Sequence, residues 1–372
     1  MTNRDSKHEE IINKILENDF HGLVYLPTGY GKTRITLKSL EQSSFNRILW
    51  VCGTEEFRDS GLWEECTKWG IKKSICNSIT AICYQSLHKT NTSKYDIVIL
   101  DEIQYITPFR VKPLYNHNGT KIIGLTGTPP RDRVKQEIFS DLGLNIIIQK
   151  TVDDGVDEEM ISDYEIDVVF CKLNDIKNIP KKGINGTFYV SEKSSYHYYN
   201  TKLAAAYDTY SKDISRLTLN RARFIYNLPS KFEHAKSIIK KYKNKRIISF
   251  SKSIGHAKIL GQTTYHSKLK KDEKLRNLDN FNSKKYNSIS TVEAANTSIN
   301  FIDVDIALIH QLDSNPGNFL QRIGRNLRYK ENVIKKMIIL CNKETQDLIW
   351  TKKCLDGLNP NKIKYYEIED YI

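Results

Sequence analysis

The feature that most constrains the fold is a glycine-containing loop between an apolar run and a helical pattern. Residues 22–26 read GLVYL, which is typical of a buried strand, and residues 32–40 have the pattern of a helix. The loop between them reads PTGYGKT. Gly29 and Gly31 permit a tight turn that aims backbone N–H groups at an anion, and the helix beginning near Lys32 adds its positive end. The arrangement predicts a phosphate-binding loop in an α/β domain, with a chance glycine-rich turn as the alternative.

The side chains of this loop fit a nucleoside triphosphate better than a simple anion. The longer pattern GxxxxGK[ST] is not met, because its first glycine would fall at Leu26, whereas the shorter TGxGKT form is complete. Lys32 is expected to reach the β- and γ-phosphates of ATP, and the Thr33 hydroxyl to ligate Mg²⁺. The expected nucleotide-binding residues are Pro27, Thr28, Gly29, Tyr30, Gly31, Lys32 and Thr33.

A pair of acidic residues follows a second apolar run. Residues 96–100 read DIVIL, and Asp101 and Glu102 come directly after them. Parallel sheets bind their ligands at the carboxyl ends of their strands, which is where these two carboxylates would lie. We expect Asp101 to hold Mg²⁺ and Glu102 to polarise the attacking water as a general base.

Apolar runs alternate with helical patterns along most of the chain, which predicts parallel sheets covered on both faces. Ser6 is expected to begin a capping box for the first helix. Further strands are expected at 47–52, 80–84 and 121–125, and a second series at 246–250, 288–292, 304–309 and 337–341. With 372 residues, we expect an ATP-binding domain over 1–150, a connecting, largely helical segment over 151–230 and a second α/β domain over 231–372.

Charge and composition restrict the partners. No apolar run approaches the ~20 residues needed to cross a bilayer, so we expect no membrane partner. Seven cysteines without a CxxC pair and a polar start favour reduced thiols and a cytoplasmic location. The net charge is +3 over residues 1–150, −5 over 151–200 and +15 over 201–372. The basic part could follow a phosphate backbone or could be a solvated lysine-rich surface.

The middle of the chain is rich in tyrosine. These side chains could stack on nucleic-acid bases, although tyrosines more often simply pack; they are Tyr189, Tyr196, Tyr198, Tyr199, Tyr207 and Tyr210.

The motifs taken together resemble those of superfamily 2 helicases, and the resemblance runs over nearly the whole chain. After the phosphate loop and Asp101–Glu102, it rests on GT at 53–54, TAICYQSL at 80–87, TGTPP at 126–130, ISFS at 248–251 and QRIGRNLR at 321–328. It implies two RecA-like parallel-sheet motor domains in tandem, with a cleft between them. The residues that it assigns to nucleic-acid contact or coupling are Gly53, Thr54, Tyr84, Gln85, Thr126, Thr128, Ser251, Thr291 and Asn300.

The resemblance also implies a mechanism. Arg325 and Arg328 would cross the cleft to the γ-phosphate as arginine fingers, and Gln321 would help to sense the nucleotide. ATP binding would close the cleft and hydrolysis would open it, so that the protein steps along a strand. The motif forms look like the branch of restriction-enzyme motor subunits, XPB-like proteins and UvsW-like DNA helicases, and the composition suggests a phage or other mobile-element version.

Three positions depart from the family pattern. Gln104 stands where many relatives have His or Asp, and the segment 296–300 reads NTSIN in place of a form such as DEGIN. Lys7 stands where this branch commonly has a glutamine that touches adenine. The leading expectation is an ATP-dependent helicase or translocase on branched, forked or partly single-stranded DNA. An RNA helicase and a non-unwinding, ATP-switched nucleic-acid clamp remain alternatives, and the sequence does not identify protein partners.

Overall fold

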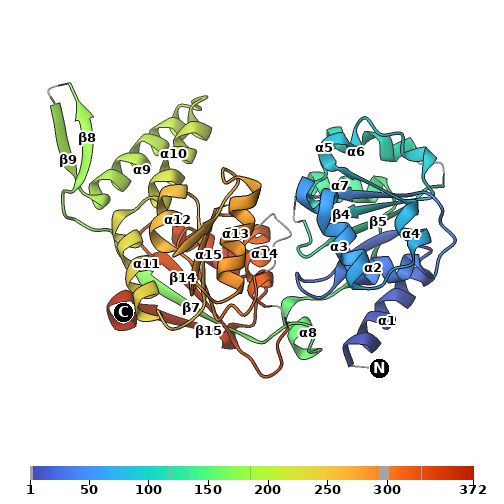
Figure 1. The fold of residues 1–372 in the computed structure, drawn as a ribbon. Helices are drawn as coiled ribbons and strands as arrows, with labels where there is room; N and C mark the ends of the chain where they lie inside the picture. Colours follow the sequence, from blue (N-terminus) through green and yellow to red (C-terminus); the bar gives the residue numbers. More distant parts are fainter. Residues whose placement is uncertain (1–2, 117–118, 131, 185, 293–300, 328) are drawn as a thin grey trace. The chain divides into compact units, whose positions relative to one another are not determined.

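The computed structural model describes residues 3–116, 119–130, 132–184, 186–292, 301–327 and 329–372, without the side chains of residues 325 and 326. The chain forms two compact units (Figure 1). The first contains Met1–Asp163 and Leu320–Val333, and the second contains Tyr164–Ala294, Phe301–Phe319 and Ile334–Ile372. Among the described residues, none of the helices has the length and apolar character needed to span a bilayer.

The first unit is built on a six-stranded sheet in the order β3-β2-β4-β5-β1-β6. All of its paired strands run parallel. The strands are β1 Gly22–Tyr25, β2 Ile48–Cys52, β3 Ile79–Cys83, β4 Ile97–Asp101, β5 Lys121–Thr126 and β6 Ile146–Gln149. The sequence analysis indicated all of them except β6, whose four residues are partly exposed at the edge of the sheet.

Helices cover both faces of this sheet because successive strand residues point to opposite sides. Ile97 and Ile99 pack in one core with α1, α2, α3 and α4, whereas Val98 and Leu100 pack in another with α5, α6 and α7. The helices are α1 Asn3–Glu17, α2 Lys32–Leu40, α3 Leu62–Lys68, α4 Lys73–Ser78, α5 Tyr84–Leu87, α6 Pro108–Val111, α7 Arg133–Asp141 and α8 Val152–Asp157. Short 3-10 turns lie at Thr92–Lys94, Ile103–Tyr105 (η3) and Lys112–Asn116, and a π turn lies at Phe57–Gly61.

The expected capping box at Ser6 is wrong. Helix α1 already begins at Asn3, so Ser6 lies inside its first turns. The apolar positions Ile11, Ile12 and Ile15 are buried as the helical spacing predicts.

The second unit contains a seven-stranded sheet in the order β11-β12-β10-β13-β14-β7-β15, again with every pair parallel. The strands are β7 Tyr164–Cys171, β10 Ile247–Ser251, β11 Thr263–Tyr265, β12 Ser288–Val292, β13 Ile306–Ile309, β14 Lys335–Asn342 and β15 Ile363–Glu367. Its helices are α11 Pro229–Lys241, α12 Ile254–Leu260, α13 Lys271–Asn282, α15 Asp347–Leu355 and α16 Ile368–Tyr371, with a 3-10 turn at Pro360–Lys362. Helix α14 Pro316–Asn326 begins in the second unit, and its residues from Leu320 onward belong to the first. The predicted pair of parallel-sheet α/β domains is therefore confirmed.

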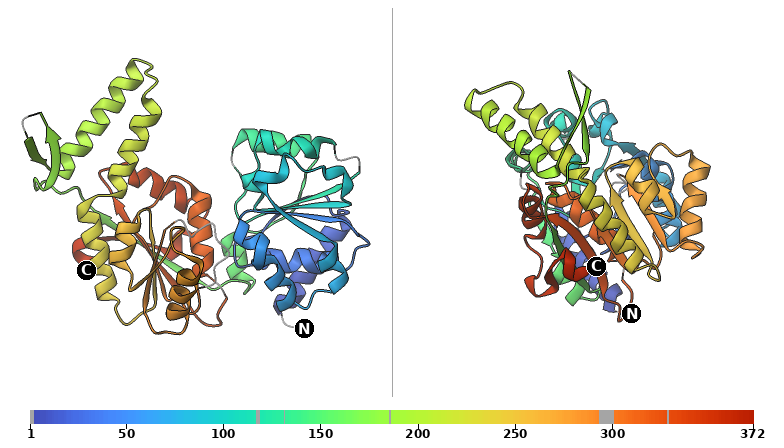
Figure 2. Two further views of the ribbon diagram at one scale, coloured as in Figure 1. Left: turned by 45° about the horizontal axis from the view of Figure 1, so that its top comes forward. Right: turned by 90° about the vertical axis from the view of Figure 1, so that its left-hand side faces the viewer.

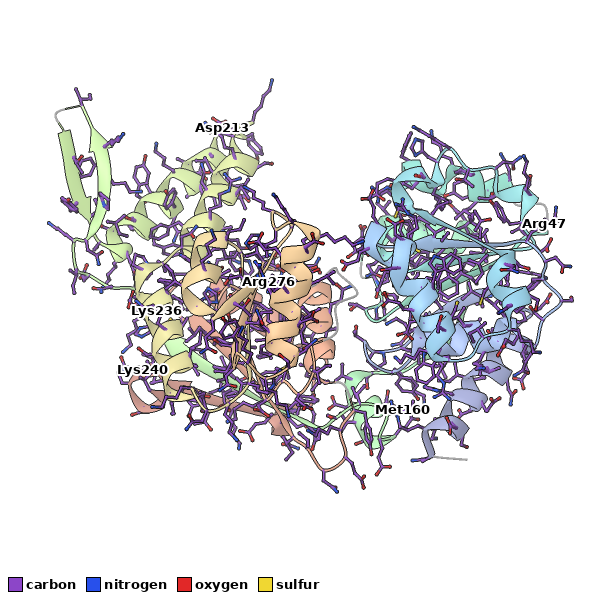
Figure 3. The ribbon with its side chains drawn as sticks, viewed as in Figure 1. Arg47, Met160, Asp213, Lys236, Lys240 and Arg276 are labelled. Atoms are coloured by element: carbon purple, nitrogen blue, oxygen red, sulfur yellow. The ribbon has the colours of Figure 1, made fainter. Side chains whose placement is uncertain are left out.

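An arm extends from the second unit, between β7 and α11 (Figure 2). It consists of a separate two-stranded antiparallel hairpin, β8 Ile179–Gly183 and β9 Gly186–Val190, followed by the paired helices α9 Glu192–Asp208 and α10 Ile214–Tyr226. Figure 3 shows Asp213 where the two helices meet, and Lys236 and Lys240 on the following helix, α11. The base of the arm packs through Tyr196, Ile225 and Leu228 against Trp350 of α15.

Candidate nucleotide-binding site and nucleic-acid contact residues

The register of the first sheet brings three predicted segments to one edge. Tyr25 of β1 lies beside Thr126 of β5, and Leu125 of β5 lies beside Asp101 of β4. The backbone N–H of Leu26 continues this pairing by donating to the carbonyl of Thr126 over 3.0 Å. The phosphate loop, the acidic pair and the 126–130 segment therefore leave the carboxyl ends of adjacent strands, where open parallel sheets bind ligands.

The loop after β1 has the backbone of an anion site. Gly29 and Gly31 have φ angles of 94° and 107°, in the left-handed region that favours glycine, and α2 begins at Lys32. A Cβ atom on Gly31 would lie 2.9 Å from His8 Nε2, so a side chain at this position would also clash. The N-terminal N–H groups of α2 together with these turns suit a phosphate group.

Two residues that the sequence analysis did not single out brace the loop. The imidazole Nε2 of His8 is 2.9 Å from the Tyr30 carbonyl, and the Tyr30 hydroxyl donates to Glu158 Oε2 over 2.6 Å. Burial lowers the pKa of His8, which favours the neutral ring with its proton on Nε2. Glu158 also accepts from Lys150 over 2.6 Å, so α1 and the residues that follow α8 hold the loop from two sides.

The charged residues of the site are largely buried. Lys32 and Asp101 are each 9% exposed, and the Lys32 ammonium donates to the Leu26 carbonyl over 3.2 Å. Burial raises the pKa of Asp101 to about 7, the adjacent Glu102 carboxylate adds to the rise and Lys32 opposes it. A carboxylate in such surroundings is stabilised by a further positive charge, which a bound divalent cation would supply.

Glu102 occupies a strained backbone position. Its φ of 55° and ψ of 57° lie in the left-handed region, where non-glycine residues are uncommon. The turn η3 begins directly after it, and Gln104 Nε2 donates to Glu102 Oε2 over 2.7 Å. Gln104 thus fixes the side chain of the predicted general base.

The segment after β5 contacts the phosphate loop. The Thr128 N–H donates to Thr126 Oγ1 over 3.0 Å, which folds 126–128 into a compact turn. A Cβ atom on Gly127 would lie 3.1 Å from Thr28 Oγ1. Thr126 is fully buried, so its side chain does not reach a nucleic-acid strand. A coupling role of Thr126 would therefore act through the residues around it.

Residues of the last predicted motif also belong to the first unit. A Cβ atom on Gly324 would lie 2.3 Å from the Thr28 Cβ atom, and Gln321 of the same helix is buried. The backbone of Arg325 is in α14, but its side chain and all of Arg328 lie outside the described residues.

The predicted nucleic-acid contacts of the first unit differ in exposure. Gly53 and Thr54 are half-buried after β2, and the Thr54 hydroxyl accepts from the Phe57 N–H over 3.2 Å. Gln85 is exposed, whereas Tyr84 is buried next to Tyr105, with ring centroids 6.3 Å apart. Burial raises the pKa of Tyr84 well above its usual range, which is typical of a packed ring rather than a surface contact.

In the second unit, Ser251 and Thr291 lie at the carboxyl ends of β10 and β12. Both are buried; Ser251 Oγ is 3.1 Å from Ser290 Oγ, and Thr291 Oγ1 is 3.5 Å from the Ser249 carbonyl. Asn300 and the rest of the 296–300 segment lie outside the described residues.

The residues present fit a magnesium nucleotide. The glycine turns leave the backbone open to phosphate oxygens, and Thr33 and Asp101 offer the hard oxygen ligands that Mg²⁺ prefers. Among the described residues, no group of three or more His, Cys, Asp or Glu side chains forms a metal site of its own.

Comparisons with known proteins find similarity to helicases and to a DNA translocase. Residues 230–330 match the helicase conserved C-terminal domain. The chain is 25% identical over 339 residues to the DNA 3'-5' translocase XPB2 of Sulfurisphaera tokodaii, covering 83% of this chain and 75% of that protein. The fold resembles the Hef helicase domain of Pyrococcus furiosus, with a TM-score of 0.53 at 14% identity over 94% of this chain and 97% of that one. It also resembles Dbp5 of S. cerevisiae bound to RNA and ADP BeF3, with a TM-score of 0.62 at 13% identity over 98% and 90%.

Two parallel-sheet units in one chain, the first with a phosphate loop and an acidic pair at the ends of its strands, resemble the tandem RecA-like domains of helicases. The matched C-terminal helicase domain and the similarity to the XPB2 translocase support a superfamily 2 helicase.

Proposed function

We propose that the protein is an ATP-dependent DNA helicase or translocase that moves on, or remodels, branched, forked or partly single-stranded DNA. The observation that carries the nucleotide part is the alignment of the phosphate loop with Asp101 at one edge of the first sheet. The DNA part is supported by the XPB2 relative, a DNA 3'-5' translocase, and by the basic C-terminal half of the chain. Such a substrate would place the protein in DNA repair or recombination.

The residues of the first unit divide the chemistry of ATP hydrolysis. The loop N–H groups and Lys32 bind the phosphates, and Thr33 and Asp101 would hold Mg²⁺, which neutralises charge on the phosphate oxygens. Glu102, oriented by Gln104, takes the proton of the attacking water. The contact of Gly127 with Thr28 gives the 126–128 turn a direct route for sensing the state of the loop.

Arg325 and Arg328 remain proposed arginine fingers, and Gln321 a proposed nucleotide sensor. The support is that Gly324, the residue before Arg325, lies against Thr28 of the phosphate loop. We expect Arg325→Ala to bind nucleotide with little change but to hydrolyse it about 10³-fold more slowly. The control is Arg276→Ala, an exposed arginine of α13, which should hydrolyse ATP at the wild-type rate (Figure 3).

The test of the ATPase is a steady-state assay with and without DNA. We expect wild-type turnover to rise on adding DNA and Lys32→Ala to lose it by about 10²-fold or more. The matched control is Lys38→Ala in the last turn of the same helix. Its ammonium pairs with Glu41 at 2.8 Å, away from the phosphate loop, so this variant should behave as wild type. Equal, DNA-independent turnover in wild type and Lys32→Ala would contradict the proposal.

The choice of polymer and junction is tested in the same assay. The sequence does not show whether the protein reads the 2′-hydroxyl that distinguishes RNA from DNA, so the assay compares the two polymers. Stronger stimulation by poly(dT) than by poly(U) supports the DNA motor. Stimulation mainly by poly(U) would favour an RNA helicase. Strand displacement from forked and four-way substrates, compared with linear tailed duplexes, identifies the preferred junction.

A further inference from the structure

The β8–β9 hairpin of the arm builds no core. It forms a separate two-stranded sheet, and its described residues from Pro180 to Tyr189 are all exposed except Lys181, which is half-buried. Phe188 and Tyr189 are 52% and 57% exposed. Because both rings remain exposed, they do not serve as the core of this hairpin, and an isolated two-stranded hairpin is at best marginally stable in water.

The hairpin register interleaves these aromatic side chains with lysines. Lys181 lies directly across from Phe188, whereas Tyr189 lies across from Pro180, on the face that it shares with Lys182. Each face of the ribbon therefore presents one aromatic ring and one ammonium group. The Lys181 ammonium is also 5.8 Å from the ring centroid of Tyr199 on α9, so the pattern continues onto the helices.

The charge of the hairpin has one sign. Residues 176–190 contain three lysines and no acidic residue, and residues 172–223 contain ten basic and four acidic residues. Of those four acids, Glu192 is buried and Asp213 pairs with Arg216 at 3.1 Å. The exposed surface of the arm is therefore complementary to a polyanion.

The hairpin is joined to the second unit through a firmly held residue. Ser191 caps α9, and its Oγ accepts from the Ser194 N–H over 3.1 Å. The next residue, Glu192, accepts from the N–H groups of Asn174 and Ser230 and from the Ser230 hydroxyl, over 2.7–2.8 Å. These bonds fix the point where β9 ends and α9 begins.

We propose that the β8–β9 hairpin binds single-stranded DNA, with bases stacked on Phe188 and Tyr189 and phosphates beside Lys181 and Lys182. Exposed aromatic rings next to cations are the combination that binds unpaired bases, since every base has a π face. A duplex hides those faces inside its stack, so the hairpin selects unpaired over paired strands. This inference deepens the proposed function and rests on it.

The first test measures binding of a fluorescently labelled dT oligonucleotide to the full chain without nucleotide. We expect the double variant Phe188→Ala, Tyr189→Ala to bind about tenfold more weakly or worse. The double variant Phe188→Leu, Tyr189→Leu, which keeps apolar bulk without a π face, should be weakened similarly. The double variant Phe188→Tyr, Tyr189→Phe should bind as wild type does. The control Tyr365→Ala removes an exposed ring from β15 and should leave binding unchanged.

The second test is spectroscopic. Tyr189→Trp should show a fluorescence change on adding the oligonucleotide that neither wild type, with its four native tryptophans, nor Tyr365→Trp shows. This signal reports on position 189 itself, and the absence of a fluorescence change in folded Tyr189→Trp would overturn the proposal.

Further outcomes separate this proposal from others. Wild-type affinity for dT in the leucine double variant would show that apolar bulk, rather than a π face, makes the contact. An equal loss of duplex and dT binding in the alanine double variant would identify a duplex contact. Either result overturns the proposal. The ATPase of the wild-type protein is measured alongside. If DNA does not stimulate it, the proposed function fails, while dT binding still reports separately on the hairpin.

Discussion

At the residue scale, His8 links the first helix to nucleotide binding. Its ring is buried and contacts the Tyr30 carbonyl at 2.9 Å. We expect His8→Ala to raise KM for ATP by about 2–10-fold with a smaller effect on kcat, because one hydrogen bond that positions the loop is lost. His8→Gln, whose amide can donate to the same carbonyl, should recover part of the loss. Lys14→Ala on the exposed side of α1 is the control, and a KM unchanged in His8→Ala would contradict the bracing role.

The protonation of His8 gives this contact a pH dependence. Because burial lowers its pKa, the folded protein favours the neutral ring and the unfolded chain binds the proton more readily. The stabilisation is therefore present above the ordinary histidine pKa of 6.5 and is lost as the pH falls through the folded value. As the pH falls below 6.5, the KM for ATP should rise more steeply in wild type than in His8→Gln, because only the histidine gains a proton.

Asp101 predicts a pH effect of the opposite sign. Its pKa is raised from 3.8 to about 7, so its contribution to stability is present below 3.8 and is lost as the pH rises through 7. Asp101→Asn should therefore raise the free energy of unfolding at pH 8, by on the order of 2–4 kcal/mol, and much less at pH 5. Urea unfolding without nucleotide or metal measures this.

Asp96 serves as the comparison for Asp101. A hydrogen bond from Arg47 lowers the pKa of Asp96, so its stabilisation is present above the unfolded value and Asp96→Asn should destabilise at both pH 5 and pH 8. If the free energy of unfolding changed with pH in the same way in Asp101→Asn and Asp96→Asn, the raised pKa of Asp101 would be refuted.

Local sequence was sufficient to predict some site residues and not others. Lys32 and Asp101 could be proposed because Lys32 lies in the glycine-containing loop after the apolar strand β1, and Asp101 ends the apolar strand β4. His8 and Glu158 could not, because they reach Tyr30 from 22 and 128 residues away and belong to no recognisable motif. The strained φ of Glu102 likewise has no counterpart in the residue type.

At the element scale, a buried ion pair joins α11 to α15. The Lys231 ammonium donates to Asp347, their side chains are 1% and 0% exposed, and Asp347 also accepts from the Asn342 N–H over 2.9 Å. We expect Lys231→Met to lower the free energy of unfolding by about 3–5 kcal/mol, because it leaves a buried carboxylate without its cation. Lys231→Met with Asp347→Leu should recover part of that loss.

The control for the ion pair is Lys236→Met on α11. Lys236 pairs with Glu233 at 2.8 Å on the surface, so its loss should change the free energy of unfolding by less than about 0.5 kcal/mol (Figure 3). A comparable loss in both variants would show that the burial of Lys231 is not what matters.

Some buried strands were predictable from their apolar runs, but the buried strand β7 was not, since the sequence analysis placed it in the connecting segment. The runs at 247–251 and 306–309 are apolar because helices cover both faces of the sheet, and the sequence analysis placed strands there. The hairpin β8–β9 has neither an apolar run nor a buried face, so it gave no strand pattern. The same exposure that made it unpredictable marks it as a binding surface.

At the scale of the whole molecule, the basic charge of the C-terminal half predicts a salt-sensitive affinity for DNA. The logarithm of the binding constant should fall linearly with the logarithm of salt concentration, and each lost phosphate contact on a single strand lowers the slope by about 0.7. Lys181→Ala with Lys182→Ala should reduce the slope by twice that amount, whereas Lys236→Ala should leave it unchanged. A salt-independent wild-type affinity would contradict a backbone-following surface.

Strand β7 lies between β14 and β15, although it precedes β14 by more than 160 residues in the chain and β15 by more than 190. During translation β7 therefore emerges as an apolar ribbon with both edges open, and it waits until nearly the whole second unit has left the ribosome. If translation ends before residue 335, neither β14 nor β15 is made, and both edges of β7 stay without a partner. Incomplete products of this gene should consequently aggregate readily and depend on chaperones.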